Sequence, residues 1–197
     1  ALVKRLFSKV TSTIIDVGSL ESAEMVKIMN NTFRDVKFGY ANEMALMCRE
    51  LDLDMVKLVH AANHGYTRDV IPVPSPGVGG ACLTKDPYIL LHSCRGLKNQ
   101  PQIVKLARQA NEQIPCQIVD DIHNLLKELR KESVKIFIIG FAFKGEPETT
   151  DIRGSTTIDL LNHFCGKGYK DESFFGYDPI VSKVEIEKLG VTPVSIS

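Results

Sequence analysis

The sequence predicts an α/β protein in which an all-helical region comes before a small parallel sheet. Apolar residues recur at helical spacing from residue 25 to residue 51, and helical patterns continue almost to residue 131. A nearly continuous apolar run at 134–139 then ends at Gly140, as a buried strand of a parallel sheet does. The boundaries that follow are an incoming strand or linker over 1–20, a helical domain over 21–131 and a sheet domain over 132–197.

The first elements are expected to be a short strand and a long helix. A β-branched run at 13–17, closed by Gly18, predicts the strand. Ser22 opens a helical pattern that no proline interrupts before Leu51, although Gly39 weakens its middle. A helix of this length in a small domain is expected to supply an interface as well as a core.

The rest of the helical region is expected to combine shorter helices with one structured loop. Prolines and then glycines punctuate residues 64–81, and Thr84 is expected to cap the helix that follows. Pro115 is expected to interrupt the last helix. The helices predicted here span 54–63, 87–94 and 102–131.

A strand–loop–helix–strand order begins with the strand that ends at Gly140 and implies a small doubly wound sheet. The first strand is expected to be buried in it, because its apolar run is nearly continuous. The remaining elements are predicted as a polar loop at 144–154, a helix at 155–165, a strand at 173–177, a short helix at 182–189 and a last strand at 191–195.

The composition is that of a globular protein without the charge signature of a nucleic-acid partner. Its 24 basic and 24 acidic residues cancel, and 44% of the chain is hydrophobic. No apolar run approaches the length of a membrane span, and the N-terminus has no signal-peptide pattern. The five cysteines are odd in number and form no CxxC pair, which favours reduced thiols. We therefore expect a cytoplasmic protein with no membrane or nucleic-acid partner.

Cys82 follows a glycine-rich turn and comes just before a predicted helix. Gly77, Gly79 and Gly80 let the backbone approach a ligand closely. The free amides and the dipole of the helix favour an anion, and Lys85 acts in the same direction, so a reactive thiolate is physically reasonable. The alternative is a glycine-rich turn with an incidental cysteine.

Three motifs, in order over nearly the whole chain, resemble one known family. Residues 76–88, which contain Pro-Gly-Val-Gly-Gly-x-Cys and Lys-Asp-Pro-Tyr, resemble the nucleophile loop of the UDP-glucose, GDP-mannose and UDP-N-acetylhexosamine 6-dehydrogenases. Residues 22–33, with Asn42 and Glu43 beyond, are similar to that family's central helix. Its C-terminal nucleotide-binding domain is matched at 140–145, 151–155 and 177–179. The resemblance implies a helical dimerisation domain followed by a Rossmann-like UDP-binding domain.

The resemblance implies an NAD-dependent, two-step oxidation of a sugar C6 alcohol to a carboxylate, with Cys82 as the nucleophile. The thiol attacks the aldehyde to form a thiohemiacetal, and its oxidation gives a thioester that water hydrolyses. Lys27 and Asn31 lie one helical turn apart, and by analogy with the family they would stabilise the developing oxyanion. Asp86 would activate or orient the water. Without the motif, the alternative is that Lys27 and Asn31 are ordinary exposed helix residues. Asp86 would then be only a negative charge in the first turn of a helix, where it favours the helix dipole.

The resemblance also implies contacts with substrate and cofactor. Lys85 and Arg153 match positions on the cofactor side. Arg68 resembles an arginine that family dimers insert into the neighbouring subunit's site. The residues implied in binding the UDP-sugar are Arg68, Gly77, Val78, Gly79, Phe143 and Lys144.

The family's NAD-binding first domain has no counterpart in this sequence. The strand that ends at Gly140 lacks the G-x-G-x-x-G fingerprint, so the sheet domain is not expected to be a typical NAD site. We therefore expect a fragment that dimerises through its long helix and does not reduce NAD by itself.

Two positions bear on the choice of sugar. Val78 and the Asp-Pro-Tyr that begins at Asp86 favour UDP-N-acetylmannosamine or UDP-N-acetylglucosamine over UDP-glucose and GDP-mannose. The alternative of another class is a non-catalytic nucleotide-sugar-binding and dimerisation module. A different thiol enzyme would need a histidine base, which no motif places. His60 and His64 are spaced like a metal pair but have no third ligand, so no metal is expected.

Overall fold

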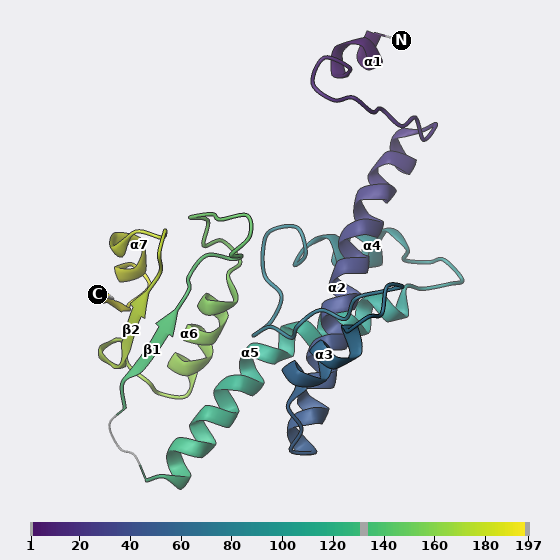
Figure 1. The fold of residues 1–197 in the computed structure, drawn as a ribbon. Coiled ribbons are helices and arrows are strands. Elements are labelled where there is room, and N and C mark those ends of the chain that lie inside the picture. Colours follow the sequence, from purple (N-terminus) through teal and green to yellow (C-terminus); the bar gives the residue numbers. More distant parts are fainter. Residues whose placement is uncertain (1, 131–133, 196–197) are drawn as a thin grey trace.

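The computed structural model describes residues 2–130 and 134–195 and places a helical region before a three-stranded parallel sheet (Figure 1). This arrangement confirms the predicted α/β class. The helical region contains α1 (Leu2–Phe7), α2 (Leu20–Glu50), α3 (Met55–Asn63), α4 (Asp86–Ser93) and α5 (Gln102–Glu128). The sheet region contains β1 (Ile136–Ile139), α6 (Thr156–Gly166), the 3-10 turn η1 (Asp171–Ser173), β2 (Phe174–Tyr177), α7 (Lys183–Glu187) and β3 (Thr192–Pro193).

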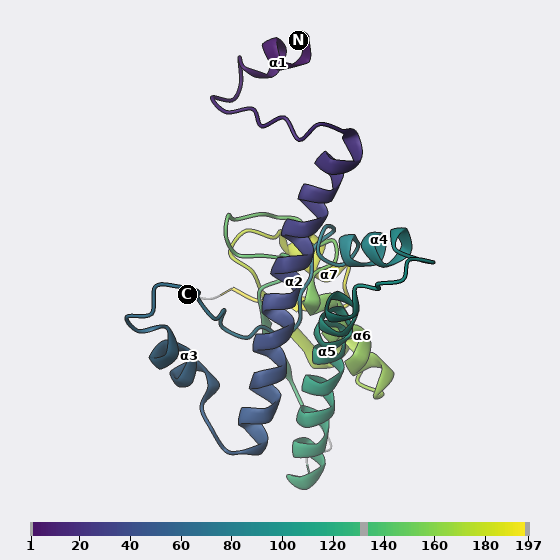
Figure 2. The ribbon, with the colours of Figure 1, turned by 90° about the vertical axis from the view of Figure 1, so that its right-hand side faces the viewer.

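Helices α2 and α5 pack against each other and frame the helical region (Figure 2). Helix α2 begins at Leu20 and not at Ser22, because the Ser19 hydroxyl accepts the Ser22 N–H at 3.1 Å. Gly39 lies where the two helices meet. A Cβ atom at Gly39 would come within 2.9 Å of the Ala107 Cβ. The glycine that weakens α2 locally therefore allows α5 to approach closely.

The strand predicted at 13–17 does not form. This segment is irregular and exposed, and it lies between α1 and α2, away from the rest of the molecule (Figures 1 and 2). A strand needs a partner for its N–H and C=O groups. No strand of the described chain pairs with this segment. A β-branched composition alone is therefore insufficient here.

The interruption predicted at Pro115 is also wrong, because α5 continues through it to Glu128. A proline removes one N–H from the helix ladder, which is a local cost. The Pro115 ring is buried, and a Cβ atom at Gly77 would lie 3.1 Å from it. Close packing at this point offsets the local cost. The predicted helix end at Lys131 falls outside the described residues.

The sheet is parallel throughout, in the order β1-β2-β3. One face carries the core of this region. Val119 of α5, Leu161 of α6 and Ile186 of α7 belong to the same apolar cluster as Phe174 of β2. The three helices therefore cover the same face of the sheet.

The other face is open in the described part of the chain. Phe137 and Ile139 of β1 are 48% and 68% exposed, and they pair in register with Phe175 and Tyr177 of β2. The expected burial of β1 and the doubly wound arrangement are therefore wrong for these residues. The apolar run predicts the strand correctly, but it does not reveal which face is covered, because both faces carry apolar side chains.

Candidate active site

The glycine-rich turn that precedes Cys82 packs against the sheet region. Gly80 N–H donates to the Gly154 carbonyl at 2.8 Å. A Cβ atom at Gly79 would lie 2.1 Å from the same oxygen, and one at Gly80 would lie 2.7 Å from the Phe143 ring. These glycines are therefore needed for contact between two parts of the chain. Approach to a ligand, the reason expected for Gly77, Gly79 and Gly80, stays a prediction.

Cys82 is exposed and lies in the turn that leads into α4. Its carbonyl accepts the N–H groups of Lys85 at 3.2 Å and Asp86 at 2.9 Å. The expected capping of α4 by Thr84 is wrong, because Lys85 is the N-cap residue and no side chain caps the helix. The Thr84 hydroxyl donates instead to the Gly80 carbonyl at 3.0 Å and tightens the turn.

Lys27, Asn31 and Asp86 meet beside this turn. Lys27 Nζ lies 2.8 Å from Asp86 Oδ2, and Asn31 Nδ2 donates to the same oxygen at 2.5 Å. The Asp86 side chain is 1% exposed, whereas that of Lys27 is 60% exposed. Lys27 and Asn31 therefore lie on one face of α2, as their spacing predicts, and a buried carboxylate holds both.

The electrostatics of the cluster keep Asp86 ionised. Burial raises the pKa of Asp86, but the hydrogen bonds from Lys27 and Asn31 outweigh it, and the net pKa lies below the usual value. The hydrogen bond to Asp86 raises the pKa of Lys27, and the negative charge of a Cys82 thiolate acts in the same direction. Cys82 is thus an electrostatic neighbour of Lys27. Lys85 lies 4.0 Å from Asp86 Oδ1 and adds a second cation.

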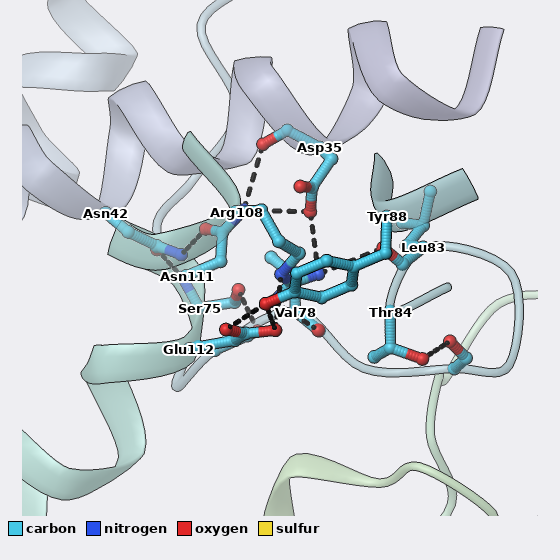
Figure 3. A network of polar contacts seen from close by, with 12 residues as sticks. Asp35, Asn42, Ser75, Val78, Leu83, Thr84, Tyr88, Arg108, Asn111 and Glu112 are labelled. Atoms are coloured by element: carbon cyan, nitrogen blue, oxygen red, sulfur yellow. Dashed lines mark hydrogen bonds and ion pairs between the residues drawn. The ribbon is translucent and has the colours of Figure 1, made fainter. Parts of the chain in front are cut away.

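A buried polar network lies behind the cysteine turn, and it was not predicted from the sequence (Figure 3). Arg108 of α5 and Asp35 of α2 form an ion pair of 2.9 Å, with side chains 2% and 0% exposed. Asn111 donates to the Asp35 backbone and side-chain oxygens at 2.9 Å, and Asn42 donates to Asn111 at 2.9 Å. A signal for it exists, since Asn31, Asp35 and Asn42 recur at spacings of four and seven along α2.

The residues expected on the substrate and cofactor sides are only partly brought together. Phe143 lies against Gly80, and Lys144 Nζ stands 5.4 Å from the Phe143 ring centre. Arg153 is 83% exposed and pairs with Asp151 at 2.7 Å, which lowers the pKa of Asp151 to about 2. Arg68 is exposed in the loop after α3.

The sheet region does not fit a dinucleotide at the end of β1. A dinucleotide-binding fold offers free backbone amides to the pyrophosphate there. Here the Asp178 carboxylate accepts hydrogen bonds from the backbone amides of Phe141 at 2.6 Å and Ala142 at 3.3 Å. It also accepts those of Ile180 and Val181, and together these bonds hold the pKa of Asp178 below its usual value against burial, which raises it. The backbone amides of Phe141 and Ala142 are therefore already hydrogen-bonded within the chain and are not free to bind a pyrophosphate.

Two further features concern metals and membranes. In the described ranges, no group of three His, Cys, Asp or Glu side chains is arranged to hold a metal ion. No helix in those ranges is both long enough and apolar enough to span a bilayer.

The fold has a helical region that contains a cysteine turn, followed by a parallel sheet. Comparison with known proteins shows that this is the fold of the nucleotide-sugar dehydrogenases. Residues 21–113 match the central domain of the UDP-glucose/GDP-mannose dehydrogenase family. The chain belongs to this family.

Relatives from several organisms are similar to the chain. A UDP-N-acetyl-D-mannosamine dehydrogenase of Methanococcus vannielii is 30% identical over 94% of the chain, which spans 41% of that protein. A UDP-N-acetyl-D-glucosamine 6-dehydrogenase of Salmonella typhi is 29% identical over 99% of the chain, which covers 46% of it. The solved structure of the Pyrococcus horikoshii UDP-D-ManNAc dehydrogenase superposes with a TM-score of 0.77 at 31% identity, over 92% of this chain and 42% of that one.

Proposed function

We propose that the chain is the sugar-processing part of an NAD-dependent 6-dehydrogenase that acts on a UDP-N-acetylhexosamine, either UDP-N-acetylmannosamine or UDP-N-acetylglucosamine. The observation that carries this proposal is the convergence of Lys27, Asn31 and Asp86 beside the exposed Cys82. The similarity to the mannosamine and glucosamine enzymes supports this class of sugar.

In the proposed reaction, the Cys82 sulfur attacks the C6 aldehyde carbon and forms a thiohemiacetal. Lys27 and Asn31 present N–H groups on one face of α2 and stabilise the oxygen that gains negative charge. Oxidation of this adduct leaves a thioester on Cys82. Water then attacks the thioester carbonyl, the carboxylate departs, and the thiolate is restored.

Asp86 is proposed to orient that water rather than to remove its proton. Its lowered pKa makes it a weak base, and one of its oxygens already accepts bonds from Lys27 and Asn31. The same bonds keep the two donors fixed before the aldehyde arrives, which is the preorganisation that oxyanion stabilisation requires.

We propose that NAD, when bound, would accept the hydride of each oxidation, and that Lys85 and Arg153 would contact its phosphates. The two cations are 62% and 83% exposed. Asp178 already accepts hydrogen bonds from the backbone amides at the end of β1. In this proposal the chain therefore binds the cofactor only through exposed side chains such as Lys85 and Arg153. Arg68, the glycine turn, Phe143 and Lys144 are proposed to bind the UDP-sugar.

Capture of a sugar aldehyde tests the proposal without any cofactor. The chain is mixed with UDP-N-acetylglucosamine 6-aldehyde carrying ¹³C at C6, and the carbon resonance is followed. We expect a thiohemiacetal signal with the wild-type chain and with Cys165→Ser, whose cysteine is also exposed. Cys82→Ser should lose the signal. Capture that survives Cys82→Ser, or that never occurs, contradicts the proposal.

We also propose that α2 forms a homodimer interface. Several large apolar side chains of this helix are exposed, among them Met29 at 60% and Phe33 at 59%. Sedimentation analysis should show a dimer for the wild-type chain and a monomer for Phe33→Asp, because a charge would be buried without a partner. Val184→Asp is the matched control, since Val184 of α7 is 59% exposed. A Phe33→Asp chain that remains dimeric refutes this interface.

A further inference from the structure

Three side chains share one row of α2 and join it to two different partners. Lys27, Asn31 and Asp35 succeed each other at intervals of four residues, so they lie on one face of the helix. The first two bind Asp86, and the third binds Arg108 of α5. The face that presents the proposed oxyanion donors is therefore also the face that anchors Arg108.

Arg108 ties the cysteine turn to this row. Its Nη1 donates to Asp35 Oδ1 at 2.9 Å and to the Leu83 carbonyl at 3.0 Å, and its Nη2 donates to the Val78 carbonyl at 3.2 Å (Figure 3). The two carbonyls lie on either side of Cys82 in the chain. The turn is thus held at both ends by one planar guanidinium.

The same arginine is connected to the helix that bears Asp86. Arg108 Nε lies 3.3 Å from a Glu112 carboxylate oxygen. The Tyr88 hydroxyl of α4 donates to that carboxylate, at 2.7 and 2.9 Å from its two oxygens. Residues one turn apart on α5 therefore set the positions of the cysteine turn and of α4.

A simple packing role does not account for this arrangement. Burying an ion pair is costly, and an apolar pair of similar volume fills space at least as well. Burial raises the pKa of Asp35, and only the charge of Arg108 and the Asn111 hydrogen bond oppose it. What an apolar side chain lacks is a rigid fork of donors that fixes three acceptors at set distances.

We infer that Arg108, held by Asp35, is a positioning residue that sets Cys82 against Lys27 and Asn31. The inference rests on the proposed function of Cys82. In this inference Arg108 does not contact the substrate. The Arg108–Asp35 ion pair instead holds the cysteine turn in a fixed position relative to the face of α2 that carries Lys27 and Asn31.

Arg108→Lys in the 197-residue chain tests this inference, because lysine keeps a charge for Asp35 but lacks the fork. Two quantities are measured: the iodoacetamide reaction rate of Cys82 relative to Cys165, and hydrogen exchange of the amides at 78–85. We expect the rate ratio to fall roughly tenfold and exchange in the turn to accelerate. Val119→Ala is the control, since it cuts a buried side chain of α5 in the sheet-region core and should change neither quantity.

Two results would overturn the inference. One is an Arg108→Lys chain with an unchanged rate ratio and unchanged exchange in the turn. The other is a Val119→Ala chain that shows the same changes, because the effect would then follow from lost stability alone. Failure of the proposed function is distinguishable: Cys82 would react no faster than Cys165 in the wild-type chain, while exchange at 78–85 would still report whether Arg108 anchors the turn.

Discussion

Replacing Gly79 by alanine is expected to detach the cysteine turn from the sheet region. The new methyl group would stand 2.1 Å from the Gly154 carbonyl oxygen, which is a backbone atom and cannot rotate away. We expect the free energy of unfolding to fall by about 1–3 kcal/mol, as for other overpacking changes. The hydrogen bond from Gly80 N–H to Gly154 should open as well. Urea unfolding measures the first effect, and exchange of the Gly80 amide measures the second.

Gly166→Ala is the matched control for this change. Gly166 is the last residue of α6, and a Cβ atom there meets nothing within 4 Å. Alanine also favours the helix over glycine, so stability should be unchanged or slightly increased. If the two variants unfold at the same urea concentration, the close contact between the turn and Gly154 does not exist in solution.

The fold could be predicted where the pattern along the chain reflects local rules. The period of α2 and the apolar run of β1 indicate a helix and a strand because helical spacing and a short apolar run are properties of a short segment. The segment 13–17 and Pro115 behave differently, since their outcome depends on partners. The first has no strand beside it, and the second is buried against the glycine turn.

The candidate site was predictable to the extent that a motif or a helical period carries it. The spacing of Lys27 and Asn31 predicts that they share a face, and the motif predicts that Cys82 stands near them. The choice of Asp86 as the acceptor of both could not be derived, because it depends on how α4 packs against α2. Arg108 and Asp35 are 73 residues apart, so their pairing leaves no local pattern.

The reaction of Cys82 with iodoacetamide, relative to that of Cys165, is expected to be about tenfold faster at neutral pH. Both cysteines are exposed, so access alone does not separate them. The difference should come from the Lys27 ammonium group, because the thiolate is the attacking form of a cysteine and a nearby cation favours it. Peptide mass spectrometry of the partly alkylated chain gives both rates from a single sample.

Lys27→Met makes this measurement decisive, because it removes the cation and keeps a side chain of similar length. The rate of Cys82 should then approach that of Cys165, with the Cys165 rate unchanged. Two results would contradict the claim that Lys27 of α2 activates Cys82 as a nucleophile. One is a wild-type chain in which Cys82 and Cys165 react at equal rates. The other is a Lys27→Met chain in which Cys82 still reacts about tenfold faster than Cys165.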